Sequence, residues 1–235
     1  MNQHSSIDKL IKLNEEGVIP RENETESSFF KRVEKDKPSF NYSYCKKNLS
    51  FYEMACVIVD EAKVEVFLHP IFEKKENFLG ISKQEIIDHE KVHFIRQGFK
   101  QGRFEETIAY LTSKCRFRKI LGGFFKNYIE AKIFVFTTFA VPVFAFLEFG
   151  FYWFFASYLS YIFYLVYRTV RDYKIVSSVL SKLQKISQRP LDILVRLSDQ
   201  EILELKNKKE EETPHFFETK QNDVRFQQIL FFFKR

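Results

Sequence analysis

The sequence is poor in cysteine and has no clustered cysteine pair. It contains Cys45, Cys56 and Cys115 in 235 residues, and no two of them stand in a CxxC arrangement. An odd number of widely spaced cysteines argues against a disulfide framework and against a cysteine-rich zinc knuckle. The first 17 residues also lack an apolar core of signal-peptide length. We therefore expect the soluble parts of the chain in a reducing cytosol.

A glycine-rich phosphate-binding loop, an internal repeat and a strong excess of one charge are also missing. The formal net charge is +6, which is well below that of a dedicated nucleic-acid binder. We expect no nucleic-acid partner. The length allows one good-sized domain with appendages.

Phenylalanine, by contrast, is abundant, with 29 residues, and many of them lie in one apolar run. Residues 133–167 contain a single ionisable acid, Glu148. One membrane span needs about 20 apolar residues, so this run is too long for one span and long enough for two short ones. A charge at the bilayer centre is costly, which places the turn at Glu148 near the far interface. The sequence predicts a two-helix transmembrane hairpin whose first helix contains Pro142, as lipid-embedded helices tolerate.

Positive charge flanks this run on both sides, which predicts that both ends of the hairpin are cytoplasmic. The cations are Lys114, Arg116, Arg118, Lys119, Lys126 and Lys132 before the run, and Arg168, Arg171 and Lys174 after it. The alternative is a hairpin buried in a soluble core, but a soluble helix normally carries a polar stripe. The expected location is the membrane, with two spans, the lipid bilayer as partner, and both termini cytoplasmic.

The N-terminal part of the sequence is expected to form a small fold that contains both helices and strands. Residues 1–25 are expected to be irregular, and a helix is expected from Glu26 to the residue before Pro38. Two β-branched runs within residues 51–70 predict a β-hairpin that ends at Pro70.

Two further helices are expected before the apolar run. Ser82 and Glu85 form a capping-box pattern that begins a helix closed by Gly98. A second helix is expected from about Phe104. After the apolar run, residues 175–187 are expected to be helical, Pro190 breaks the helix, and Ser198 with Glu201 forms another capping box. The apolar tail at 224–235 docks on the body or on the membrane, and the sequence leaves this open.

The segment "DHEKVH" at 88–93 lies in the middle of the first of these helices. His89 and His93 are four residues apart, so both imidazoles project from one helix face. Two such nitrogens suit one tetrahedral Zn²⁺. Glu90 lies beside them, where it can accept a proton from a water on the metal. A third, acidic ligand is expected from the next helix, where "FEETIAY" supplies Glu105 and Glu106.

"HEKVH" followed by "EETIA" resembles the gluzincin zinc metallopeptidases, over roughly residues 50–112. Their pattern is HExxH plus a glutamate on a following helix, often with alanine three residues later. The resemblance implies Zn²⁺ ligands at His89, His93 and Glu106, the last followed by Ala109, and a general base at Glu90. The hairpin is similar to that of membrane-embedded gluzincins, which act at the cytosolic face. More loosely, the whole chain resembles uncharacterised membrane proteins of chlamydia-type intracellular bacteria.

The chain departs from the gluzincin pattern in two respects. Only 12 residues separate His93 from Glu106, and Tyr110 stands where the family often has an aspartate that orients a ligand histidine. Glu105 is a candidate for that orienting role, or for the ligand position in place of Glu106. Tyr110 is a candidate for polarising the scissile carbonyl or holding an oxyanion, and also for simple packing.

Other residue types that could carry chemistry have simpler interpretations. His69, before Pro70, is expected in a turn, Cys56 in the core of a strand, and nothing in the spacing requires His215 at the site.

The expected fold class is α+β and mostly helical, in three parts. These are a zincin-like cytoplasmic domain at 1–125, a transmembrane hairpin at 126–170 and a cytoplasmic helical tail at 171–235. The expected function is that of a membrane-anchored zinc metalloendopeptidase, which would hydrolyse peptides or membrane proteins with a zinc-activated water and Glu90 as base. The alternative is a non-enzymatic membrane-anchored scaffold in which the HExxH helix is degenerate or fortuitous.

Overall fold

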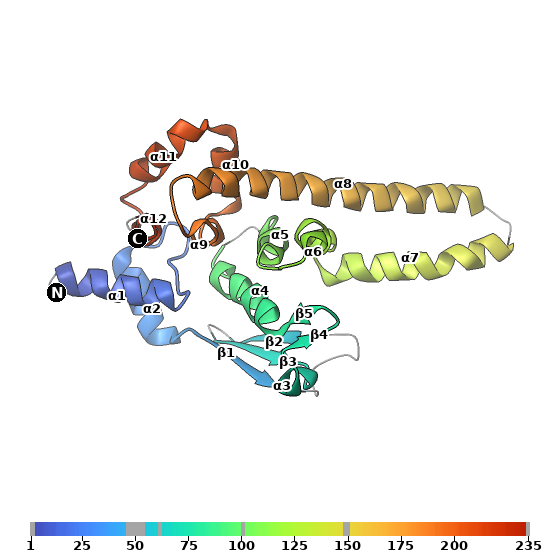
Figure 1. Ribbon diagram of the computed structural model, residues 1–235, viewed down its shortest axis with the longest axis horizontal. Helices are drawn as coiled ribbons and strands as arrows, with labels where there is room; N and C mark the ends of the chain where they lie inside the picture. Colours follow the sequence, from blue (N-terminus) through green and yellow to red (C-terminus); the bar gives the residue numbers. More distant parts are fainter. Residues whose placement is uncertain (1–2, 46–54, 61–62, 100–101, 148–150, 234–235) are drawn as a thin grey trace.

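The computed structural model describes residues 3–45, 55–60, 63–99, 102–147 and 151–233. A mostly helical body carries a small sheet, and a long helical hairpin projects from one end of it (Figure 1). The first and last described segments lie in the body, away from the tip of the hairpin. The predicted class, α+β with helix dominating, is confirmed.

The sheet contains the predicted hairpin and one strand that the sequence did not reveal. Strands β2 (Ala55–Asp60) and β3 (Lys63–Leu68) pair antiparallel, as predicted. Strand β1 (Ser39–Tyr44) adds to the other side of β3 in parallel, so the order is β1-β3-β2. Val64, Val66 and Leu68 alternate into the core, as a sheet with one buried face requires. Helix α3 (Ile71–Lys74) and the short pair β4 (Asn77–Phe78) and β5 (Ile81–Ser82) follow.

The expectation of an irregular N-terminus is wrong. Helix α1 spans Gln3–Glu15, and Leu10 and Leu13 on it are buried in the main core. Its stability comes from this tertiary packing, because a helix of this length is marginal on its own. Helix α2 (Glu26–Asp36) agrees with prediction. It is capped by Thr25, whose side chain accepts a hydrogen bond from the Ser28 N–H.

Two predicted helices build the centre of the body. Helix α4 spans Lys83–Arg96, and α5 spans Glu105–Tyr110. Ser82 caps α4 by accepting from the Glu85 N–H at 3.1 Å. The Glu85 carboxylate pairs with Arg118 at 2.9 Å, whereas a capping box would direct it back to the cap. Helix α6 (Arg116–Leu121) and the 3₁₀ helix η1 (Gly122–Phe124) lead from α5 to the hairpin.

The hairpin consists of α7 (Tyr128–Leu147) and α8 (Phe151–Gln184), which pack side by side (Figure 1). Within the described residues one helix, over Tyr128–Phe146, is long and apolar enough to cross a membrane. The prediction of two spans is not supported. The first part of α8 is rich in tyrosine and serine, whose hydroxyl groups lower its hydropathy, and its later part is packed into the body. The predicted turn at Glu148 lies outside the described residues.

Large apolar side chains of the hairpin are left uncovered by the rest of the chain. Phe146 on α7 is 87 % exposed and Trp153 on α8 is 83 % exposed. Their neighbours include Phe136, Phe139, Tyr152 and Phe163, each more than two-thirds exposed. An exposed apolar surface of this extent marks an interaction site.

The C-terminal helices dock on the body, which answers the question that the sequence left open. They are α9 (Pro190–Val195), α10 (Asp199–Asn207), the 3₁₀ helix η2 (Glu210–Glu212), α11 (Thr213–Thr219) and α12 (Val224–Leu230). The Asn14 side chain on α1 donates to the Gln228 carbonyl on α12 at 3.0 Å, and Gln228 donates to the Leu10 carbonyl at 3.2 Å. The capping box of Ser198 and Glu201 is confirmed at the start of α10.

A buried arginine fixes α4 to these C-terminal helices. Arg96 is 1 % exposed and donates to the Leu197 carbonyl at 2.7 Å and to Asp199 at 2.8 Å. A third bond, at 3.2 Å, goes to the Val195 carbonyl. The helix that carries the HExxH motif is therefore anchored at its C-terminal end by α9 and α10.

Candidate metal centre

The structure brings the three predicted ligand residues together. His89 and His93 lie one turn apart on α4, and Glu106 faces them from the first turn of α5. The His89 Nε2 atom is 3.3 Å from His93 Nε2 and 3.7 Å from a Glu106 carboxylate oxygen. The other Glu106 oxygen is 3.5 Å from His93 Nε2.

The 3.5 and 3.7 Å separations belong to different Glu106 oxygens; with one atom taken from each residue, the candidate ligand atoms lie within 4.8 Å of one another. Zinc bonds of about 2.0–2.1 Å place neighbouring tetrahedral ligand atoms about 3.3 Å apart, so the set is close to what one metal ion needs. The three side chains are between 17 % and 29 % exposed, so the site is partly screened and still accessible. Two imidazoles and one carboxylate form a set of three protein ligands that is also found in catalytic zinc sites of other proteins.

Glu105 orients His93 and does not face the point on which His89, His93 and Glu106 converge. Its carboxylate lies 2.7 Å from His93 Nδ1. With the Nδ1 proton donated to Glu105, Nε2 is free to face His89 and Glu106. Burial lowers the pKa of His93, but the Glu105 hydrogen bond and the nearby Glu106 charge outweigh it and raise that pKa overall. Of the two alternatives, the geometry places Glu106 at the ligand position and Glu105 behind His93.

His89 is held in the neutral form that binds metal ions. Burial, followed by the neighbouring His93, lowers its pKa to about 3, while a hydrogen bond with the backbone of Ala109 opposes this shift. Both histidines are thus positioned by α5, one through Glu105 and the other through Ala109. Metal binding requires deprotonated nitrogen ligands, and His89 satisfies that requirement at neutral pH.

Glu90 lies beside the ligands, within the same wall of the site. Burial raises its pKa to about 7; His93 lowers it and the Glu106 carboxylate raises it. A carboxyl group with a pKa near the working pH both accepts and returns a proton efficiently. This is the property that the predicted general base needs.

The Tyr110 ring packs against the ring of His89. Its ring centroid is 4.6 Å from that of His89, with an interplanar angle of 67°. Burial raises the pKa of the phenol, and so do the nearby charges of Glu106 and Glu90. The geometry gives Tyr110 a packing contact with a ligand histidine; its action on a carbonyl or an oxyanion remains a prediction.

Sequence reasoning missed the close approach of η1 to α5. A Cβ atom at Gly122 would lie 2.1 Å from the Tyr110 Cγ atom, and one at Gly123 would lie 3.2 Å from the Thr107 hydroxyl oxygen. The adjacent glycines were a detectable signal, because glycine pairs allow backbone to approach a neighbouring element closely.

We expect Gly122→Ala to disturb the site through Tyr110. Rotation of the ring about χ2 leaves its Cγ atom in place, so either the Tyr110 side chain must change χ1 and leave His89, or α5 or η1 must shift, at a cost of about 1–3 kcal/mol typical of overpacking. Thermal unfolding should show the loss, and the metal affinity should fall with it. Gly80→Ala is the control for a new methyl group, since a Cβ there meets no atom within 4 Å, although its φ of +73° adds some strain. Equal metal affinity in G122A and wild type would contradict the expectation.

A cavity of about 220 Å³ opens beside the ligands. His89, Glu90 and Tyr110 line one side, and Ala55 at the start of edge strand β2 lines another. Glu85 and Arg118, which pair with each other, also line it. The remaining lining residues are Ile81, Ile86, Thr112 and Ser113. The cavity is large enough for one amino-acid side chain and is bounded by the groups that would do chemistry.

Two further histidines, His69 and His215, lie away from this site. His69 is a turn residue, as expected, and its Nδ1 atom accepts a hydrogen bond from the Ile71 N–H at 3.2 Å. His215 on α11 is 74 % exposed and lies 3.6 Å from Glu218. The side chain of Cys56 lies outside the described residues.

Comparisons of the chain with protein-family models, with curated proteins and with solved structures find no match. The interpretation of the site therefore depends on its geometry and its chemistry.

Proposed function

We propose that the chain is a membrane-anchored zinc metallopeptidase. The observation that supports this most strongly is the convergence of His89, His93 and Glu106, whose candidate ligand atoms all lie within 4.8 Å of one another. If the HExxH pattern on α4 were fortuitous, there would be no reason for Glu106 on another helix to complete the ligand set. There would also be no reason for a second glutamate, Glu105, to orient His93.

Zinc is the metal that this ligand set favours, because two imidazoles and one carboxylate in tetrahedral arrangement suit Zn²⁺ better than harder cations. When bound, it would polarise the scissile carbonyl and lower the pKa of a coordinated water to about 7. His89, His93 and Glu106 would hold it, while Glu105 and the Ala109 backbone keep the two imidazoles in place.

Glu90 carries the proton steps. As the water oxygen attacks the peptide carbonyl carbon, Glu90 accepts the proton that the water loses. As the carbon–nitrogen bond breaks, Glu90 returns that proton to the leaving amine, so the carboxylate is regenerated. A peptide side chain would enter the cavity lined by Tyr110 and Ala55.

The hairpin provides the anchor. The 20 residues of α7 extend about 30 Å at 1.5 Å per residue, which equals the hydrocarbon thickness of a bilayer. The first part of α8 lies alongside α7 and also exposes large apolar side chains. Because α8 returns the chain to the same body, insertion of α7 carries this part of α8 into the bilayer with it. The site and both ends of the described chain then share one side, which the flanking positive charge makes the cytoplasmic one.

Metal analysis of the detergent-purified chain tests the proposed function. We expect one zinc ion per chain, and we expect His89→Ala to lose it, because two remaining ligands bind zinc weakly. His215→Ala is the matched control, since that histidine is exposed on α11. A wild-type chain without stoichiometric zinc, or zinc content unchanged in H89A, would reject the metallopeptidase and favour the non-enzymatic scaffold.

A further inference from the structure

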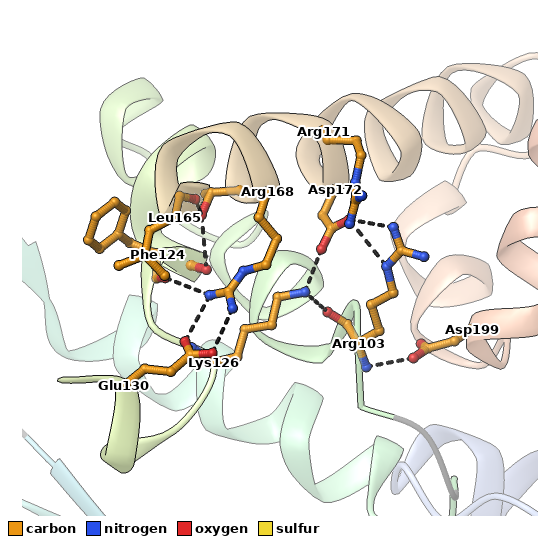
Figure 2. Close-up of polar contacts among 11 residues, drawn as sticks. Arg103, Phe124, Lys126, Glu130, Leu165, Arg168, Arg171, Asp172 and Asp199 are labelled. Atoms are coloured by element: carbon orange, nitrogen blue, oxygen red, sulfur yellow. Dashed lines mark hydrogen bonds and ion pairs between the residues drawn. The ribbon is translucent and has the colours of Figure 1, made fainter. Parts of the chain in front are cut away.

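Arg103, which lies just before α5, is held at its backbone as well as at its side chain (Figure 2). Its N–H donates to Asp199 at 2.6 Å, and its carbonyl accepts from the Lys126 ammonium at 2.8 Å. Its guanidinium donates to Asp172 at 2.7 Å. A loop residue with both backbone groups bonded to charged side chains has little freedom to move.

Asp172 is the centre of this arrangement. It lies on α8 and is fully buried, and its second carboxylate oxygen accepts from Lys126, immediately before α7 (Figure 2). The neighbouring Arg171 adds a longer contact at 3.4 Å, and a buried carboxylate with three cationic donors is strongly held in place. Asp172 thus joins the loop before α5 to both helices of the hairpin.

The base of the hairpin is itself fixed by a second ion pair. Arg168, one turn before Asp172 on α8, donates to both oxygens of Glu130 on α7 at 2.6 and 2.8 Å. It also donates to the Phe124 carbonyl in η1 at 3.0 Å. The two hairpin helices and the segment that leads to them therefore form one bonded unit next to Arg103.

The position of Arg103 determines the position of the metal ligand. Arg103 comes two residues before Glu105 and three before Glu106, and α5 has only six residues. A helix this short takes its position from its flanking contacts, because it cannot be stable alone. A shift at Arg103 is transmitted to Glu106, which must stay within about 0.5 Å of its productive position for catalysis.

We propose that Asp172 is a positioning residue for Glu105 and Glu106, and that the base of the hairpin thereby sets the metal affinity of the site. This inference rests on the proposed metal centre. It assigns the hairpin a second role besides anchoring, since displacement of α8 relative to the body moves Arg103 and with it the start of α5.

The test compares the Zn²⁺ affinity of Asp172→Asn with that of Glu24→Gln. Glu24 is a largely enclosed acid: it pairs with Arg32 at 2.8 Å, and its bonds go to Arg21 and Arg32, outside α4, α5 and the hairpin. Each full-length variant is purified in detergent, its melting temperature is measured, and Zn²⁺ alone is titrated against a chromogenic chelator. We expect D172N to bind Zn²⁺ about 10–100-fold more weakly, the usual effect of losing a group that supports a ligand. E24Q should melt earlier and keep wild-type affinity.

A second pair of variants covers the case in which D172N fails to fold. Lys126→Gln removes the bond to the Arg103 carbonyl and leaves the pair of Arg103 with Asp172, and Lys126→Arg restores a cationic donor. We expect K126Q to lose Zn²⁺ affinity and K126R to recover most of it. Wild-type affinity in D172N or K126Q, or an equal loss in E24Q, overturns the inference while the metal centre stands. A wild-type chain that binds no Zn²⁺ overturns the proposed function itself.

Discussion

Glu90→Gln is expected to abolish peptide hydrolysis and to leave the bound metal in place. Glutamine has the shape of glutamate but cannot accept the proton that the attacking water loses. General-base catalysis contributes about 10²–10⁴-fold to rate, and we expect a loss of that size. Glu90 is not among the three converging ligands, so the metal content should stay at the wild-type value.

Mass spectrometry of cleavage products from a mixture of amphipathic peptides, with the protein in detergent, measures this effect. Asp88→Asn is the control on the same helix, because Asp88 bonds Gln84 at 2.8 Å on the exposed surface and should be dispensable. Full activity in E90Q would exclude Glu90 as the base. Loss of metal in E90Q would show that the carboxylate acts on the ligands instead.

Arg96→Met is expected to destabilise the fold by about 3–5 kcal/mol, the usual cost of removing one partner of a buried ion pair. The change leaves Asp199 buried with its charge uncompensated by Arg96, and it removes donors from the Val195 and Leu197 carbonyls. Methionine fills much of the volume of the arginine stem, so the loss reports mainly on the polar contacts.

Chemical denaturation in detergent, followed by tryptophan fluorescence and circular dichroism, measures the free energy of unfolding. Lys185→Met is the control: its pair with Glu210 is more than half exposed on both sides, and such pairs contribute at most about 1 kcal/mol. An R96M chain within about 1 kcal/mol of wild type would show that the interior tolerates Asp199 without its partner.

The local signals in the sequence were sufficient for the elements that carry the site. Ser82 caps α4 as its position predicted, and the i, i+4 spacing placed both imidazoles on one face. The glutamate pair at 105–106 was found from the need for a third ligand, and the gluzincin pattern gave Glu106 the ligand position, which agrees with the geometry. Spacing alone left Glu105 as an alternative, because the choice depends on which carboxylate faces Nδ1 and which faces Nε2 of His93, a question of helix orientation.

Contacts between distant parts of the chain could not be predicted. Asp172 lies 69 residues from Arg103, and Asp199 lies 103 residues from Arg96. Each appears in sequence as one acid among many. Strand β1 was missed for the same reason, because its partner β3 is parallel and lies beyond β2. The pattern of Ile7, Leu10 and Ile11 was a helical signal for α1, but the surface it packs on belongs to the other end of the chain.

The positive charges beside the hairpin show the same limitation. A count of cations near a span indicates orientation, yet four of those predicted to flank the membrane have acidic partners in the protein. Arg118 pairs with Glu85, Lys126 and Arg171 with Asp172, and Arg168 with Glu130. Lys114, Arg116, Lys132 and Lys174 are exposed, and these are the cations that a membrane-bound chain would offer to lipid head groups.

The pairing of α1 with α12 determines when this protein can complete its fold during synthesis. Leu10 and Asn14 on α1 bond Gln228 on α12, so the N-terminal core stays open until residue 228 has left the ribosome. The apolar hairpin emerges much earlier, and domains form in the order of synthesis only when their contacts are local. The apolar hairpin is therefore complete in the growing chain before the contacts of α1 with α12 can form, and its exposed side chains are present throughout that interval.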